Sequence, residues 1–240
     1  MNVAAVGDLH VTGGGGAAIA EILAAADGVD ALVLCGDLTD RGLPDEARTI
    51  ARELAKAKVR VVGVLGNHDY ESGKQDEIAA ILREAGVKVL DGEGVEIGDV
   101  GFAGTKGFCG GFGDRALEPW GEPAIKAFVR EAVDESVKLG AALAKLRTAH
   151  KIAVLHYSPI VDTVVGEPPE IYPFLGSTRL AEPIDRHGAT FVVHGHAHSG
   201  AVEGRTRGGV PVYNVSLPLL RKRDLPPLRI LELAPAVAAR

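Results

Sequence analysis

ALVLCGDLTDRG, residues 31–42, joins an apolar run to a polar loop. The run over Ala31–Leu34 predicts a buried strand, and Gly36 and Asp37 open the loop directly after it. Similar segments, in which Asp, His or Asn follows an apolar run, are Gly7-Asp8-Leu9-His10, Gly66-Asn67-His68-Asp69, Leu155-His156-Tyr157-Ser158-Pro159 and Gly195-His196-Ala197-His198. Ligand sites of open α/β folds form at the carboxyl ends of strands, so we expect these segments to meet.

The first half of the chain alternates between strand and helix patterns. We predict strands at Val3–Val6, Ala31–Leu34 and Val59–Leu65, and helices at Ala17–Ala26, Pro44–Ala57 and Gln75–Ala85. Such alternation indicates parallel strands joined by right-handed crossovers.

After residue 86 the pattern changes to short strands with glycines, typical of a meander. The expected elements are strands at Val87–Leu90, Val95–Ile97, Val100–Phe102, Ile152–Leu155, Thr190–Val193, Gly200–Glu203, Val210–Val215 and Leu228–Leu233, and helices at Glu122–Leu146 and Ser177–His187. With no repeat or linker in the sequence, residues 1–240 are expected to form a single domain.

Composition limits the possible functions. The chain has 240 residues, 46% of them hydrophobic, and a net charge of −6, which disfavours a nucleic-acid binder with a broad basic face. Nucleic acid stays possible, because bound metal ions can supply positive charge. Neither a transmembrane run nor a signal-peptide pattern is present, so we expect a cytoplasmic protein without a membrane partner.

Taken singly, each polar segment could be an ordinary turn or a solvated pair. Taken together, they supply carboxylates, imidazoles and an amide after five separate apolar runs. These oxygen and nitrogen donors suit Mn, Fe or Zn, and no thiolate is among them. The sequence therefore predicts a transition-metal site.

The order D-x-H, G-D-x-x-D, G-N-H-D, H and G-H-x-H resembles the calcineurin-like metallophosphoesterase superfamily. The resemblance spans residues 7–198. It implies a four-layer α/β/β/α sandwich of two mixed β-sheets, with the metal site at the carboxyl-end loops. It also implies two divalent metal ions, of uncertain identity among Mn, Fe and Zn, and attack of a dimetal-bound hydroxide on a phosphate ester.

The resemblance also assigns roles by position. A first metal would be held by Asp8, His10, Asp37 and His198, and a second by Asp37, Asn67, His156 and His196. Asp37 would thus bridge both ions. The resemblance places His68 beside the scissile phosphate, with Asp40 as the partner that keeps it protonated and oriented, and Asp69 as a rival partner. Arg41 could bind phosphate oxygens as a fork, or form a surface ion pair.

Several substrate classes remain open. The favoured one is a small, nucleotide-like phosphodiester or phosphomonoester, because the H-Y-S-P and G-H-x-H segments resemble small bacterial phosphodiesterases. Gly36-Asp37-x-x-Asp40-Arg41-Gly42 resembles protein phosphatases, and a nuclease would have only the basic cluster at 221–223. A scaffold that has lost catalysis is disfavoured, since every motif residue is intact.

Two segments keep alternative interpretations. The glycine-rich loop at 107–113 could border the substrate pocket, with Phe108 or Phe112 as a stacking face, or merely connect two elements. The helix at 122–146 could cover a sheet or form a dimer face. His194 is expected to support the site or to be merely structural, and not to bind metal. Asn214, at the end of another predicted strand, could support the site.

Overall fold

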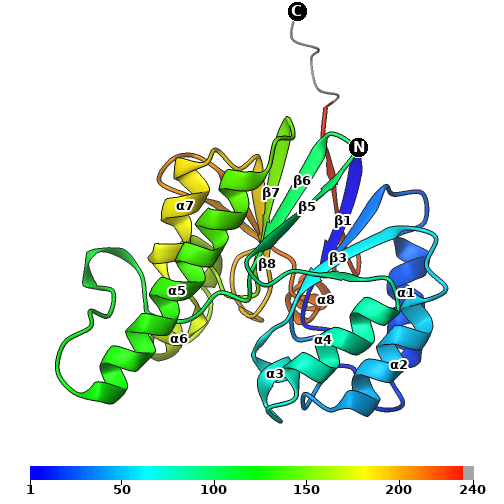
Figure 1. Cartoon of the computed structure of the whole chain (residues 1–240), viewed down its shortest axis with the longest axis horizontal. Helices are drawn as coiled ribbons and strands as arrows, with labels where there is room; N and C mark the ends of the chain where they lie inside the picture. Colours follow the sequence, from blue (N-terminus) through cyan, green and yellow to red (C-terminus); the bar gives the residue numbers. More distant parts are fainter. Residues whose placement is uncertain (235–240) are drawn as a thin grey trace, which may run out of the picture.

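The computed structural model describes residues 1–234, which form two β-sheets between layers of helices (Figure 1). The first sheet has the order β11 (Arg229–Glu232), β1 (Asn2–Val6), β2 (Ala31–Cys35), β3 (Arg60–Val64) and β4 (Lys88–Val89). The second has the order β5 (Glu93–Ile97), β6 (Val100–Gly104), β7 (His150–Val154), β8 (Phe191–His194), β10 (Pro211–Asn214) and β9 (Glu203–Arg205).

Both sheets are mixed. In the first, β1 to β4 run parallel and β11 pairs antiparallel with β1. In the second, β6, β7, β8 and β10 run parallel, while β5 and β9 are antiparallel edge strands. The carboxyl ends of the parallel strands therefore gather at one edge of each sheet, as the sequence predicted.

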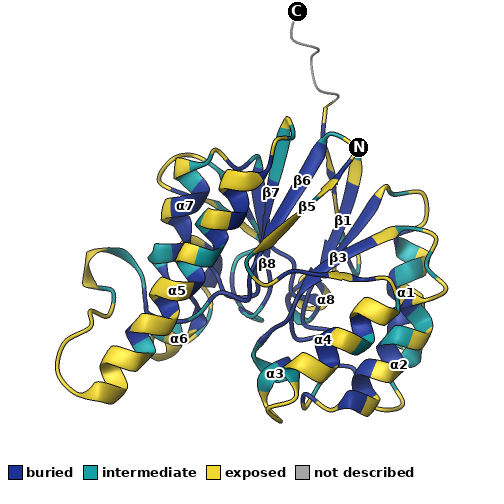
Figure 2. Ribbon diagram, in the orientation of Figure 1, coloured by how far each residue is buried: buried dark blue, intermediate teal, exposed yellow. Residues whose placement is uncertain are grey.

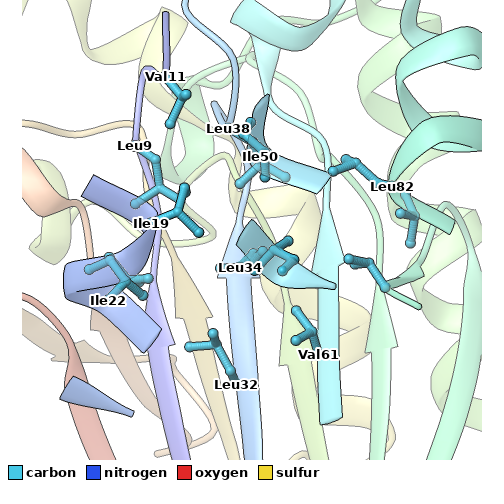
Figure 3. Close-up of a cluster of buried hydrophobic side chains, with 14 of the residues drawn as sticks. Leu9, Val11, Ile19, Ile22, Leu32, Leu34, Leu38, Ile50, Val61 and Leu82 are labelled. Atoms are coloured by element: carbon cyan, nitrogen blue, oxygen red, sulfur yellow. The ribbon is translucent and has the colours of Figure 1, made fainter. Parts of the chain in front are cut away.

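Helices α1 (Gly16–Ala25), α2 (Pro44–Leu54) and α4 (Gln75–Glu84) pack on the outer face of the first sheet. Figure 3 shows this core, in which Ile19, Ile22 and Ile50 meet Leu32 and Leu34. The alternate residues of the same strands point to the other face, because side chains alternate along a strand.

Those inward residues form a second core shared by the two sheets, in which Val33 and Val62 pack with Phe102, Ile152 and Val193. Helices α5 (Pro123–Lys145) and α7 (Ala181–Arg186) cover the outer face of the second sheet. The predicted four-layer α/β/β/α sandwich is confirmed.

The predicted meander is wrong. The strand expected at Val87–Leu90 is β4, which pairs with β3 in the first sheet, whereas β5 and β6 form a hairpin in the second. Glycine punctuation marks strand ends but not the sheet that each strand joins. The helix expected over 177–187 begins with a 3₁₀ turn at Thr178–Leu180, and the strand expected at 200–203 begins only at Glu203.

Short helices that the sequence pattern did not reveal are α3 (Asn67–Tyr70), α6 (Tyr172–Leu175) and α8 (Leu217–Lys222). Helix α5 covers the second sheet through Val129, Leu139 and Leu143, while its first turns are largely exposed (Figure 2). Among residues 1–234, no helix combines the length and the apolar character needed to cross a membrane.

Candidate metal centre

The predicted donors lie on loops at the strand ends. Asp8 follows β1, Asp37 follows β2, and Asn67 begins α3 after β3. His156 follows β7, and His196 follows β8. The structure brings these side chains together in two adjoining groups, Asp8 with His10 and His198, and Asp37 with His156 and His196. His10 also lies in a third group, with Asp40 and His68.

Distances within the groups are short. His198 Nε2 lies 2.9 Å from Asp8 Oδ1, and His156 Nε2 lies 3.3 Å from Asp37 Oδ1. Asn67 Oδ1 is 2.9 Å from His156 Nε2, which places the amide in the second group. Asp37 Oδ2 is 3.9 Å from His10 Nε2, so Asp37 lies between the two groups. This is the position expected of a shared ligand.

The backbone is unusual at the same residues. Asp8, His10, Asp37 and His196 have φ angles of 59°, 44°, 49° and 69°. Left-handed backbone costs a non-glycine residue roughly 1–2 kcal/mol. Such strain gathers where function fixes the direction of a side chain. The strained loops thus turn carboxylates and imidazoles toward one point.

Glycines allow the loops to approach closely. A Cβ on Gly66 would lie 2.2 Å from Asp37 Oδ1, and one on Gly195 would lie 2.2 Å from Asp8 Oδ2. Any larger residue would therefore displace a candidate ligand. This explains why glycine precedes the donors in both segments.

Main-chain carbonyls fix the orientation of two imidazoles. His156 Nδ1 lies 2.9 Å from the Cys35 carbonyl, and His196 Nε2 lies 3.1 Å from the Phe174 carbonyl. In each case the nitrogen at the carbonyl carries the proton, so the other nitrogen is free to bind a cation.

Burial keeps the imidazoles of His156 and His196 neutral. It lowers the pKa of His156 well below the usual value and lowers that of His196 to about 4. Neutral imidazole is the form that binds metal. Burial is the largest single influence on Asp8 and opposes its ionisation, but the hydrogen bond with His198 and the electrostatic attraction of the surrounding histidines together outweigh it and lower the pKa of Asp8 to about 2.

Without a cation, the carboxylate at the centre is unfavourable. Burial, followed by the charges of Asp8 and Asp69, raises the pKa of Asp37 to about 9. Among the described residues, the buried His10 Nε2 also has no hydrogen-bond partner. A divalent cation would satisfy this nitrogen and neutralise the carboxylates. The nitrogen and oxygen donors fit Mn, Fe or Zn.

His68 contacts Asp40 differently from the sequence expectation. Its Nδ1 lies 2.6 Å from the main-chain carbonyl of Asp40, whereas the Asp40 carboxylate faces His10 and Arg41 at 3.9 and 3.7 Å. The Asp40 carboxylate therefore does not orient His68. Since Nδ1 donates to the carbonyl, Nε2 points into the site, 4.0 Å from Asp37 Oδ2.

Asp69, the rival partner, is turned away from His68. It is fully buried and accepts hydrogen bonds from the amides of Leu38, Thr39 and Gly66. It thus ties α3 to the loop after β2. The Arg41 side chain is 75% exposed and borders the site only through Asp40, so its role stays a prediction.

Comparisons with known proteins now bear on this geometry. The sequence profile of calcineurin-like phosphoesterases matches residues 1–200. The chain belongs to the calcineurin-like phosphoesterase family. The family resemblance read from the motifs is confirmed. Comparison with functionally curated proteins finds no match to the sequence.

Solved structures share the fold of this calcineurin-like phosphoesterase. Phosphopantetheinyl hydrolase from Mycobacterium tuberculosis is 18% identical, with a TM-score of 0.66 over 100% of this chain and 98% of that chain. A putative 5′-nucleotidase from Staphylococcus aureus is 15% identical, with a TM-score of 0.53 over 89% and 48%. Purple acid phosphatase from yellow lupin is 13% identical, with a TM-score of 0.54 over 90% and 43%. At these identities the likeness shows the fold alone.

Asn214 supports the loop that carries two candidate ligands of the phosphoesterase. Its buried amide donates to the carbonyl of Ala197, between His196 and His198, at 2.8 Å, and its oxygen accepts from Ser216 at 3.1 Å. His194 lies nearby, with Nε2 2.8 Å from Thr163 Oγ1, outside the two donor groups. The end of β10 thereby fixes the loop after β8.

We expect Asn214→Ala to weaken metal binding about tenfold, the lower end for loss of a group that supports a ligand. Titration with Mn²⁺ followed by calorimetry measures this. Thr206→Ala, which removes a buried hydroxyl bonded to Asp185, is the control and should bind metal normally. Unchanged metal affinity in Asn214→Ala would limit this residue to stabilising the fold.

Proposed function

We propose that this chain is a dimetal phosphoesterase that hydrolyses a small phosphodiester or phosphomonoester, with a nucleotide-like ester favoured. The observation that carries the proposal is the meeting of the seven predicted donors from five strand ends, arranged on either side of Asp37. Two divalent ions bound there would activate water and neutralise phosphate charge.

Asp37 and His68 have separate roles in the proposed reaction. Asp37, between the two groups, would hold both ions in register, and its Oδ1 is fixed by the amide of His68 at 2.8 Å. His68 Nε2 faces the same space and is 36% exposed as a side chain, so it is accessible to substrate. We infer that His68 donates a proton or a hydrogen bond to the departing oxygen.

Charge separates the substrate classes. A net charge of −6 disfavours a long nucleic acid, and Arg41 offers one exposed fork for a phosphate. Similar structures are named a phosphopantetheinyl hydrolase and a putative 5′-nucleotidase, which supports testing phosphopantetheinyl and nucleotide esters first. A non-catalytic scaffold would not need strained backbone at four donors.

Activity should depend on bound metal. We expect chelation to lower turnover by at least about 10³-fold and added Mn²⁺ to restore it, because the ions contribute several kcal/mol to transition-state stabilisation. The measurement is a panel of mono- and diesters assayed with Mn, Fe, Zn and Mg. Full turnover in a sample shown by mass spectrometry to be metal-free would contradict the proposal, as would inactivity with every ester and metal.

A further inference from the structure

Phe174 touches the candidate site through its main chain while its side chain remains open to solvent. Its carbonyl is 3.1 Å from His196 Nε2, and the residue as a whole is 55% exposed. A large apolar side chain next to a candidate metal-binding imidazole is thus accessible to a bound molecule. Isolated exposed apolar residues are common, so exposure alone does not indicate a binding site, and the neighbours of the ring must be considered.

The ring of Phe174 is the last in a series of aromatic contacts that begins at the His196 ring. Ring centroids are 4.4 Å apart for His196 and Tyr157, and 5.9 Å apart for Tyr157 and Phe108. They are 5.0 Å apart for Phe108 and Phe128, and 6.5 Å apart for Phe128 and Phe174. The contacts therefore form a closed circuit. At one end the His196 ring contacts Tyr157, and at the other end the Phe174 carbonyl contacts His196 Nε2.

A buried lysine contacts the inner part of this circuit. The buried Lys106 Nζ lies 4.8 Å from the centroid of Phe108 and 5.4 Å from that of Tyr157, and it donates to the Gly107 carbonyl at 2.9 Å. Such cation–π contacts hold both rings in place. Helix α5, whose first turns are exposed in Figure 2, supplies Phe128 from the other side.

We propose that Phe174, backed by Phe128, determines specificity by packing against an apolar organic substituent of the phosphate ester. This inference rests on the function proposed above. A phosphate bound by metal ions at the other nitrogen of His196 would lie across this imidazole from the Phe174 carbonyl. An organic substituent that extends past the imidazole would therefore reach the Phe174 ring. An apolar substituent would cover the exposed Phe174 ring, whereas a methyl group is too small to do so.

The test uses the full chain loaded with Mn²⁺ and two dianions, phenylphosphonate and methylphosphonate, in calorimetry. The wild-type protein should bind phenylphosphonate about tenfold more tightly, as expected for covering roughly half of a phenylalanine ring. Phe174→Ala should reduce this preference to about twofold and leave methylphosphonate affinity unchanged. Its main-chain carbonyl, and hence the contact with His196, is retained.

Val137→Ala, an exposed apolar residue further along α5, is the matched control and should keep the full preference. Should Phe174→Ala fold poorly, Phe174→Gln keeps the reach of the side chain and should lose the preference equally. A folded, metal-loaded variant that keeps the wild-type preference would overturn the inference. So would an equal loss of affinity for both phosphonates, since it would indicate disturbance of His196. The binding measurement needs no turnover, so it tests this inference separately from the proposed function. Absence of hydrolysis in the ester panel would count against the proposed function only.

Discussion

Asp37→Asn should leave the purified protein with neither metal ion and lower turnover by more than about 10³-fold. The reason is its position, since Oδ1 lies 3.3 Å from His156 Nε2 and Oδ2 lies 3.9 Å from His10 Nε2. A neutral amide removes one negative charge from both donor groups. Metal counting by mass spectrometry after dialysis against Mn²⁺ measures the loss.

His10→Ala provides the contrast, because His10 lies in the group of Asp8 and His198 and not in that of Asp37, His156 and His196. We expect it to retain about one ion per chain. Asp45→Asn, whose carboxylate is 87% exposed on α2, is the matched control and should bind two ions. Two ions and normal turnover in Asp37→Asn would show that Asp37 is not shared between the metals.

Asp37→Asn should fold well without metal. Because burial raises the pKa of Asp37 above its unfolded value, the native metal-free protein disfavours the charge between pH 4 and about pH 9. Asparagine resembles the protonated form, so chelated Asp37→Asn should melt at or above the Tm of the chelated wild type at pH 7. A lower Tm would mean that Asp37 also stabilises the metal-free fold.

Side-chain chemistry explains why so much of the site could be predicted from the sequence. Asp8, Asp37 and His156 each follow a continuous apolar run, and such runs are typical of strands buried between layers. Parallel strands bring those ends to one edge. The positions of the donors were therefore predictable, although their roles as ligands stay predictions until metal is bound.

Contacts made by the main chain could not be predicted in this way. The carbonyl of Phe174 meets His196, and that of Asp40 meets His68, yet any residue type carries a carbonyl. The same limit applies to β4, which takes its place beside β3 through backbone pairing, although its Val89 also packs in the first core. An Asn at the end of the strand over 210–215 was the one sequence signal for the support that Asn214 gives.

His68→Ala should retain both metal ions while kcat falls by about 10²–10⁴, the usual contribution of a positioned acid or base. His68 donates from Nδ1 to the Asp40 carbonyl and presents Nε2 to the site. It groups with His10 and Asp40 and belongs to neither of the groups that contain Asp8 and Asp37. His187→Ala, at the end of α7, is the control for loss of a histidine and should keep wild-type kcat.

The leaving group separates proton donation from charge stabilisation. Nitrophenolate departs without a proton, so the deficit of His68→Ala should shrink on nitrophenyl esters and stay large on alkyl esters. An equal loss on both would indicate that His68 stabilises the phosphoryl oxygens instead. Asp40→Asn should change kcat less than His68→Ala on alkyl esters, because the carbonyl that holds Nδ1 is preserved. A His68→Ala protein that loses metal, or that hydrolyses alkyl esters at the wild-type rate, would remove His68 from the reaction.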